Sequence, residues 1–144
     1  MITVTNATID DFALFKLHPN NIKEIEITSG LDPDVILAAA FELSTEKFKV
    51  TVDGKVQCLF GIINSSIWFL FDESVNSLPL SFFKESRQVI KQLAVKYGNI
   101  TGLVYSGNPF AIKWAKFMGF ALSGPTEQGN NGGLFYGISY RGDY

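Results

Sequence analysis

The feature that most constrains the fold is the apolar run over residues 67–71, together with the segments that follow it. This run, Ile-Trp-Phe-Leu-Phe, is apolar on both faces of a strand, which is typical of a central strand covered on two sides. A long amphipathic helix is predicted from Pro79 to about Tyr97, and Gly98 provides its stop. A second strand is predicted at 100–105. Strand, helix and strand form a crossover unit whose hand is almost always right.

The segment before this unit predicts an antiparallel hairpin. Apolar and polar residues alternate over 48–52, and Asp53-Gly54 supplies two residues that tolerate positive φ. The partner strand is predicted at Lys55–Ile63, and a second turn at Asn64-Ser65 leads into the central run. The two turns therefore connect three consecutive strands, the last of which is central.

The N-terminal part predicts one strand and two helices. Ile2–Asn6 alternates as a half-buried strand does. Thr8 offers an N-cap oxygen for a helix at about 9–17, and Asp32 opens another helix with a proline in its first turn. Residues 19–31 are ambiguous between a short strand and a helical turn.

The C-terminal part predicts a helix and two strands. Asn108 is suited to cap a helix that Gly119 then ends. Strands are expected around 121–123 and 134–140, and the glycine- and asparagine-rich segment 128–133 is expected to be a flexible turn between them.

The predicted order of elements is β, α, α, β, β, β, α, β, α, β, β. A chain of 144 residues is expected to form a single domain, spanning 1–144, with one core. The predicted fold class is α/β, with a mixed, mostly antiparallel central sheet and helices on both faces.

Composition argues against several classes of protein. The formal charge of −2 and the absence of any lysine or arginine run argue against a nucleic-acid binder. Apolar runs are too short to span a membrane, and residues 1–5 lack the features of a signal peptide, so we expect neither a membrane protein nor secretion. The single cysteine, Cys58, cannot form an internal disulfide, and one cysteine with one distant histidine predicts no metal site.

The order of elements and one motif resemble the Gcn5-related N-acetyltransferase superfamily, known as GNAT. Four residues stand at the spacing of that superfamily's N-x-x-A-x-x-L-Y-x-x-x-G-F pattern: Asn108, Ala111, Gly119 and Phe120. The resemblance implies a GNAT-like fold in which two parallel strands, here 67–71 and 100–105, splay apart around acetyl-CoA.

The resemblance also implies roles for single residues. In the superfamily, pantetheine pairs with the exposed backbone of the first splayed strand, which assigns cofactor binding to Phe69, Leu70 and Phe71. Asn108 would contact the amide of pantetheine, and the acyl acceptor would be an amine.

Two departures from the superfamily's pattern oppose this assignment. Its pyrophosphate loop, Q/R-x-x-G-x-G/A, corresponds to residues 72–81, which contain no glycine or arginine but two carboxylates and a proline. Each lost hydrogen bond to a charged group removes about 1.5–3 kcal/mol, so coenzyme A should bind weakly. Ala115 stands where many GNAT enzymes carry a tyrosine as general acid. Acetyl-CoA is therefore implied by the resemblance but opposed by the loop.

Three residues are candidates for proton transfer: Glu24, His18 and Tyr105. Glu24 would deprotonate an amine, His18 is the only histidine, and Tyr105 ends the second splayed strand. Each also has a plainer interpretation. Glu24 fits a solvated carboxylate, His18 a surface or capping residue, and Tyr105 a packed aromatic of the sheet.

A second resemblance covers most of the chain. Residues 11–15 (Asp-Phe-x-x-Phe), His18, the Trp68-Phe69 strand and the glycine-free loop are similar to the small, acetyltransferase-like internal virion proteins of T7-like bacteriophages. It implies a virion or the cytoplasm of an infected bacterium, and a protein partner from virion or host. Two functions stay open. One is a virion-associated or host-interaction protein with a degenerate acetyl-CoA site; the other is an active N-acyltransferase that acetylates an amine.

Overall fold

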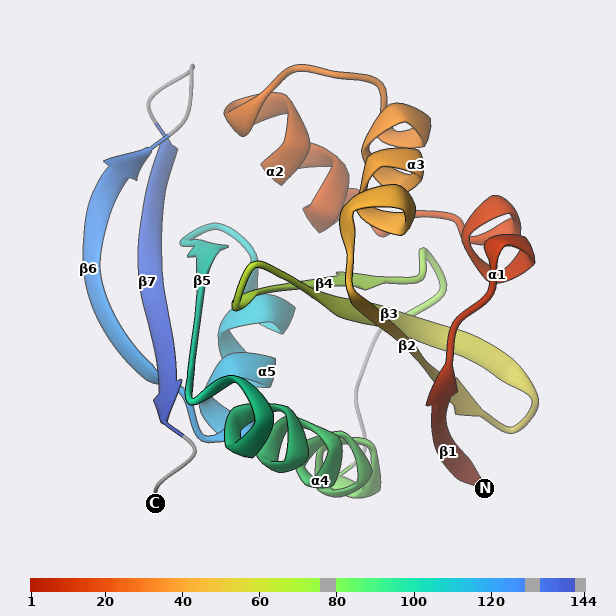
Figure 1. Ribbon diagram of the computed structural model, residues 1–144. Coiled ribbons are helices and arrows are strands. Elements are labelled where there is room, and N and C mark those ends of the chain that lie inside the picture. Colours follow the sequence, from red (N-terminus) through yellow and green to blue (C-terminus); the bar gives the residue numbers. More distant parts are fainter. Residues whose placement is uncertain (76–79, 129–132, 142–144) are drawn as a thin grey trace.

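A seven-stranded sheet forms the middle layer of the molecule, with helices packed on both of its faces (Figure 1). The computed structural model describes residues 1–75, 80–128 and 133–141. In chain order the elements are β1 (Ile2–Asn6), α1 (Ile9–Leu14), α2 (Pro19–Thr28), α3 (Pro33–Leu43), β2 (Glu46–Val52), β3 (Lys55–Ile63), β4 (Ser66–Phe71), α4 (Leu80–Tyr97), β5 (Asn99–Tyr105), α5 (Pro109–Met118), β6 (Ala121–Gln128) and β7 (Gly133–Arg141).

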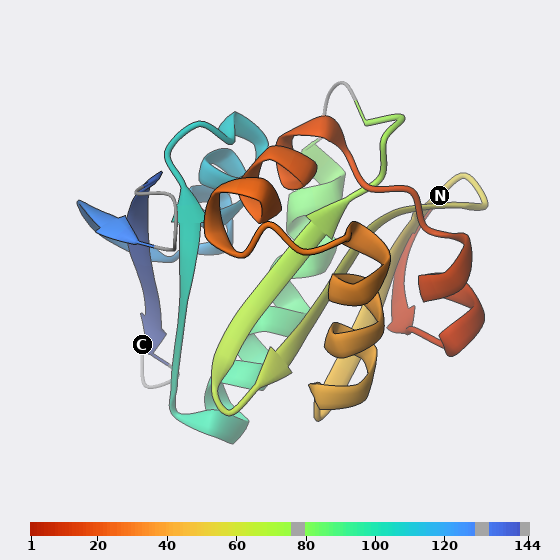
Figure 2. The ribbon, with the colours of Figure 1, turned by 90° about the horizontal axis from the view of Figure 1, so that it is seen from above.

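The strands lie in the order β1-β2-β3-β4-β5-β7-β6, which places β4 in the centre, as its apolar sequence predicts. Neighbouring strands are antiparallel except β4 and β5, which run parallel. Within the described part of the chain these two pair only at Ser66 and Thr101, near their beginnings. They diverge toward their C-terminal ends, as Figure 2 shows. The predicted fold class, a mixed and mostly antiparallel sheet, is confirmed.

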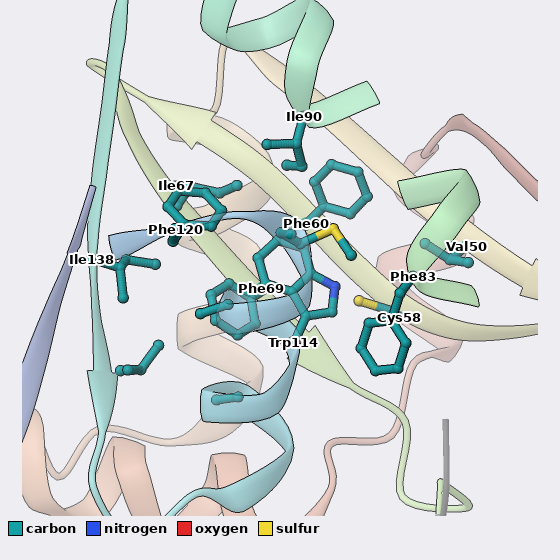
Figure 3. Packing of buried hydrophobic residues seen from close by; sticks show 14 of the residues in the cluster. Val50, Cys58, Phe60, Ile67, Phe69, Phe83, Ile90, Trp114, Phe120 and Ile138 are labelled. Carbon is teal, nitrogen blue, oxygen red and sulfur yellow. The ribbon is translucent and has the colours of Figure 1, made fainter. Parts of the chain in front are cut away.

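One core lies between the sheet and the two helices α4 and α5 (Figure 3). Trp114 of α5 is fully buried there, and its ring stacks on that of Phe69 in β4 with centroids 4.1 Å apart. Helical spacing also predicts burial of Phe117, but this ring is 43% exposed and stacks on Phe83 of α4. The difference arises because the buried stripe of α5 passes through Ala111, Ala115 and Met118, which leaves Phe117 beside the solvent-facing lysines.

A second core lies on the opposite face, under α1, α2 and α3 (Figures 1 and 2). Trp68 of β4 belongs to this side, and its indole N–H donates a hydrogen bond to Ser44 Oγ at 2.7 Å. Its ring lies over Gly61 of β3, where an added Cβ would stand only 2.7 Å from it. Glycine is therefore required opposite Trp68, because any side chain would push the ring away.

The helix predicted at 9–17 is shorter in the structure. It ends at Leu14, because Phe15 has extended backbone angles and Leu17 instead bridges to Asp72. The cap at Thr8 is confirmed, as part of a capping box with Asp11.

The ambiguous residues 19–31 contain a helix, α2, so three helices precede β2 where two were predicted. His18 is its N-cap and Pro19 occupies its first turn, a combination that favours helix initiation. Of the other predictions, Pro79 and most of the turn at 128–133 lie outside the described residues.

Candidate functional site

The divergence of β4 and β5 opens a cavity of about 340 Å³ between the two strands and α2. Its walls come from β4 (residues 66–70), from Gly102 and Leu103 of β5 and from one side of α2, including Asn21 and Glu24. The cavity is mostly apolar, with Glu24 as its one ionisable lining residue within the described part of the chain.

Glu24 is tied to the first turn of α5 by a single hydrogen bond. Asn108 Nδ2 donates to Glu24 Oε2 at 3.2 Å, while Asn108 Oδ1 accepts from the backbone N–H of Ala111 at 3.2 Å. Burial raises the pKa of Glu24 to about 7, although the hydrogen bond from Asn108 acts in the opposite direction. The carboxyl group therefore exchanges a proton near neutral pH, which is the property that a general base requires.

Asn108 is completely buried, and its side-chain amide bonds both to the first turn of α5 and to the carboxyl group of Glu24. The cap predicted from the sequence is confirmed. The contact with Glu24 joins two residues 84 positions apart in the chain.

The end of β4 is occupied by the start of α2. Asn21 Oδ1 accepts a hydrogen bond from the backbone N–H of Phe71 at 2.9 Å, and the backbone N–H of His18 donates to the carbonyl oxygen of Phe71 at 2.9 Å. Both backbone groups of Phe71 are thus bound by the protein itself.

Alternation along β4 then fixes the direction of its other backbone groups. The N–H of Asp72 bonds to Gln57 of β3, whereas the groups of Phe71 point away from β3. The backbone N–H and C=O groups of successive residues in a strand point to opposite sides. Those of Leu70 therefore point toward β3, and those of Phe69 point into the opening between β4 and β5. Of the three residues that the resemblance assigns to the cofactor, Phe69 presents its backbone to the cavity.

The loop after β4 uses its own amides for internal hydrogen bonds. The N–H groups of residues 72–75 donate, in order, to Gln57 O, Lys16 O, Asp72 Oδ2 and Asp72 O. Burial of Asp72 opposes its ionisation, but hydrogen bonds from Ser74 and the charge of Lys55 outweigh burial and lower the pKa of Asp72. The described residues of this loop therefore hold a carboxylate and committed amides where a pyrophosphate would require free N–H groups.

His18 has a structural position in which both ring nitrogens are engaged. Nδ1 accepts from the backbone N–H of Asn20 at 3.1 Å, which caps α2, and Nε2 lies 3.0 Å from the carbonyl oxygen of Val75. Because Nδ1 is an acceptor, Nε2 carries the hydrogen and donates to Val75. The ring links α2 to the loop after β4.

Tyr105 packs its ring within the sheet, although its carbonyl oxygen accepts a hydrogen bond from the backbone N–H of Asn108 at 3.0 Å. The Tyr105 ring packs on Phe135 of β7, with centroids 5.4 Å apart. It also lies so close to Gly107 that an added Cβ there would approach it to 2.5 Å. Ala115, at the position of the superfamily's tyrosine, is fully buried in the core. The structure brings Glu24, Asn108, Phe69 and Leu70 together, and it places His18 and Phe71 at the beginning of α2.

Asn21 is the site residue that the sequence interpretation missed. It is 2% exposed and stands four residues before Ile25, which is also buried, so both lie on the inner face of α2. A helical interpretation of residues 19–31 would have placed them together. Nothing in the sequence identifies its partner on β4.

Across residues 1–75, 80–128 and 133–141, no group of three or more His, Cys, Asp or Glu side chains is arranged to hold a metal ion. No described helix is long and apolar enough to cross a membrane.

No protein-family model matches the sequence, and no curated protein does. Solved structures do resemble it. The ribosomal-protein-S5-alanine acetyltransferase from Vibrio fischeri aligns with a TM-score of 0.68 and 13% identity, covering 99% of this chain and 93% of that one. The aminoglycoside acetyltransferase AAC(6')-Ib in complex with coenzyme A aligns with a TM-score of 0.68 and 14% identity, covering 98% of this chain and 95% of that one. An N-acetyltransferase from Staphylococcus aureus Mu50 aligns with a TM-score of 0.67 and 17% identity, covering 98% of this chain and 97% of that one. The likeness shows that this chain has the GNAT acetyltransferase fold.

Proposed function

We propose that this protein is a GNAT-fold protein with a degenerate acetyl-CoA site, which acts by binding another protein through its surface. The observation that carries the proposal is the commitment of the loop amides at 72–75 to acceptors within the chain. The sequence resemblance to internal virion proteins of T7-like bacteriophages supports a phage-encoded protein. It would bind a virion or host protein, either in the phage particle or in the infected bacterium.

The energetics favour this proposal over efficient cofactor binding. A pyrophosphate at this loop would have to displace Asp72 from the Ser74 N–H and then lie beside the carboxylate it displaced. Each hydrogen bond to a charged group is worth about 1.5–3 kcal/mol, so several unmade bonds remove most of the affinity that such a loop provides. The hydrogen bonds of Phe71 to α2 further shorten the strand edge open to pantetheine.

Calorimetric titration with acetyl-CoA, combined with thermal unfolding, tests the proposal. A ligand at 100 times its Kd stabilises a protein by ~2.7 kcal/mol, so even moderate affinity shifts the melting temperature visibly. We expect neither heat nor a shift at millimolar acetyl-CoA. A coenzyme-A-dependent acetyltransferase titrated in parallel calibrates the assay, and saturable binding that Asn108→Ala weakens would overturn the proposal.

A second candidate function is N-acyl transfer to an amine, and one observation favours it. Glu24 lies in the cavity between the splayed strands, with a pKa of about 7. In this function the Glu24 carboxylate accepts the proton that the attacking amine releases. Turnover of an amine with acetyl-CoA that Glu24→Gln abolishes, with the fold unchanged, would establish this function in place of the first.

A further inference from the structure

An apolar groove lies between α1 and α3, on the helical layer that covers one face of the sheet. The two helices are side by side in both views (Figures 1 and 2). The groove has a volume of about 300 Å³ and is lined by residues that include Ile9, Phe12, Asp34, Leu37, Phe41 and Glu42. At its floor the rings of Phe12 and Phe41 meet edge to face, with centroids 5.3 Å apart. We call these residues the α1–α3 groove.

Many of the exposed apolar side chains belong to the elements that form this groove. The described residues include ten large hydrophobic side chains that are exposed, and five of the ten belong to α1, to α3 or to the turn before α3: Ile9, Leu14, Leu31, Val35 and Leu43. Leu14 is 80% exposed and Leu43 is 64% exposed. Such a concentration of apolar surface on one part of a molecule is typical of a contact site for another protein.

The charge around the groove is negative. Neither α1 nor α3 contains a lysine, arginine or histidine, whereas Asp34 and Glu42 are exposed and line the groove. Lys47 offsets part of this negative charge, because its ammonium group lies 4.2 Å from the centroid of the Phe41 ring and donates to the Phe41 carbonyl oxygen at 3.0 Å. Asp11 is paired with Lys49. An occupant that matches this surface is therefore apolar with flanking positive charge.

The same chain carries a surface of that kind on the opposite helical layer. Lys113, Lys116 and Phe117 stand three and four residues apart on α5, so they share one exposed face of the helix, which we call the α5 ridge. Phe117 is the exposed ring noted above, and Lys113 Nζ lies 6.0 Å from its centroid. α5 contains no acidic residue.

We propose that the α1–α3 groove of one molecule binds the α5 ridge of a second copy, with Phe117 over Phe12 and Phe41 and the two lysines toward Asp34 and Glu42. The two surfaces lie on opposite layers of the fold, so the contact is head to tail, and a pair of copies retains one free ridge on the first copy and one free groove on the second. Association of this kind continues into chains or closes into a ring. It is independent of acetyl-CoA binding.

Sedimentation over a range of concentrations tests this contact. The groove is small, so we expect weak association, with a mean mass that rises above the 15.9 kDa monomer only toward roughly 1 mM protein. The ridge variant Lys113→Glu/Lys116→Glu and the groove variant Asp34→Asn/Glu42→Lys should each stay monomeric. Lys23→Glu/Lys91→Glu alters two exposed lysines outside the ridge by the same total charge and should associate like the natural chain.

Mixing the two variants provides the decisive measurement. The ridge variant keeps an intact groove and the groove variant keeps an intact ridge, so an equimolar mixture should form a one-to-one pair and no larger species. A natural chain that is monomeric at every concentration would overturn the proposal, as would a mixture that stays monomeric. A closed dimer that the ridge variant still forms would also overturn it.

Discussion

The side-chain oxygen of Asn21 accepts a hydrogen bond from the backbone N–H of Phe71 at 2.9 Å, which fastens the first turn of α2 to the last residue of β4. The backbone of His18 bonds to the carbonyl oxygen of the same residue. In a GNAT fold this strand end lies where the two parallel strands separate. Here the chain fills the position itself, which stabilises the fold and reduces the strand edge left for a ligand.

Replacing Asn21 by alanine should destabilise the protein by about 1–3 kcal/mol, because the Phe71 N–H would remain buried without its acceptor. Urea unfolding measures the loss. Asn20→Ala, a change of the same kind at a half-buried neighbour, should change stability by no more than about 0.5 kcal/mol. Equal losses in the two variants would show that the contact with Phe71 contributes nothing specific.

The two hydrogen bonds of His18 should be separable by mutation. His18→Asn keeps an N-cap acceptor for α2 but loses the bond to Val75, whereas His18→Ala loses both. We expect the alanine variant to be less stable than the asparagine variant by about 0.5–2 kcal/mol, the usual value of an N-cap. Denaturant unfolding of both variants gives this difference, and identical stabilities would argue against a capping role.

Glu24 should make stability depend on pH in a defined window. Its pKa is about 7 in the folded protein and near its ordinary value of 4.5 in the unfolded chain, so the folded state retains a proton that the unfolded chain releases between these values. Stability should therefore fall as pH rises from about 4.5 to 7.

Glu24→Gln removes this titration while keeping an oxygen for Asn108. At pH 8 the variant should be more stable than the natural chain, by an amount on the order of 2 kcal/mol, and the advantage should vanish near pH 4. Melting curves from pH 4 to 8 test the prediction. Glu85→Gln, at an exposed carboxylate of α4, should give parallel curves, and the same result for Glu24→Gln would contradict the shifted pKa.

Restoring the superfamily's tyrosine at position 115 should harm the fold. Ala115 is fully buried, so Ala115→Tyr would overpack the core and cost at least about 1–3 kcal/mol. Phe117→Tyr, on the exposed side of the same helix, should be tolerated. Urea unfolding compares the two. A stable Ala115→Tyr protein that acetylates an amine would contradict both this prediction and the proposed function.

Much of the fold was predicted because its signals are local. The turn at Asp53-Gly54, the cap at Asn108 and the stop at Gly119 each depend on a few adjacent residues, and the structure confirms them. The central place of β4 followed from its apolarity on both faces. The early end of α1 was not predicted, because a bridge between Leu17 and Asp72 competes with the local helical pattern.

The site depended on information that the local sequence does not contain. Residues 19–31 carry an irregular pattern because α2 turns polar side chains inward: Asn21 is buried against β4, and Glu24 is partly buried against Asn108. A search for apolar periodicity alone therefore misses this helix. The role of His18 was ambiguous for the same reason, since Val75 is 57 residues away in the chain.

The sequence by itself determined the order of most elements, the parallel crossover and the lack of glycine in the loop after β4, because these follow from residue type and near-neighbour spacing. The tertiary structure alone decided that the amides of residues 72–75 are already bonded, that α2 closes the end of β4 and that Glu24 is partly buried beside Asn108. Hydrogen-bond partners and desolvation depend on which distant segments meet.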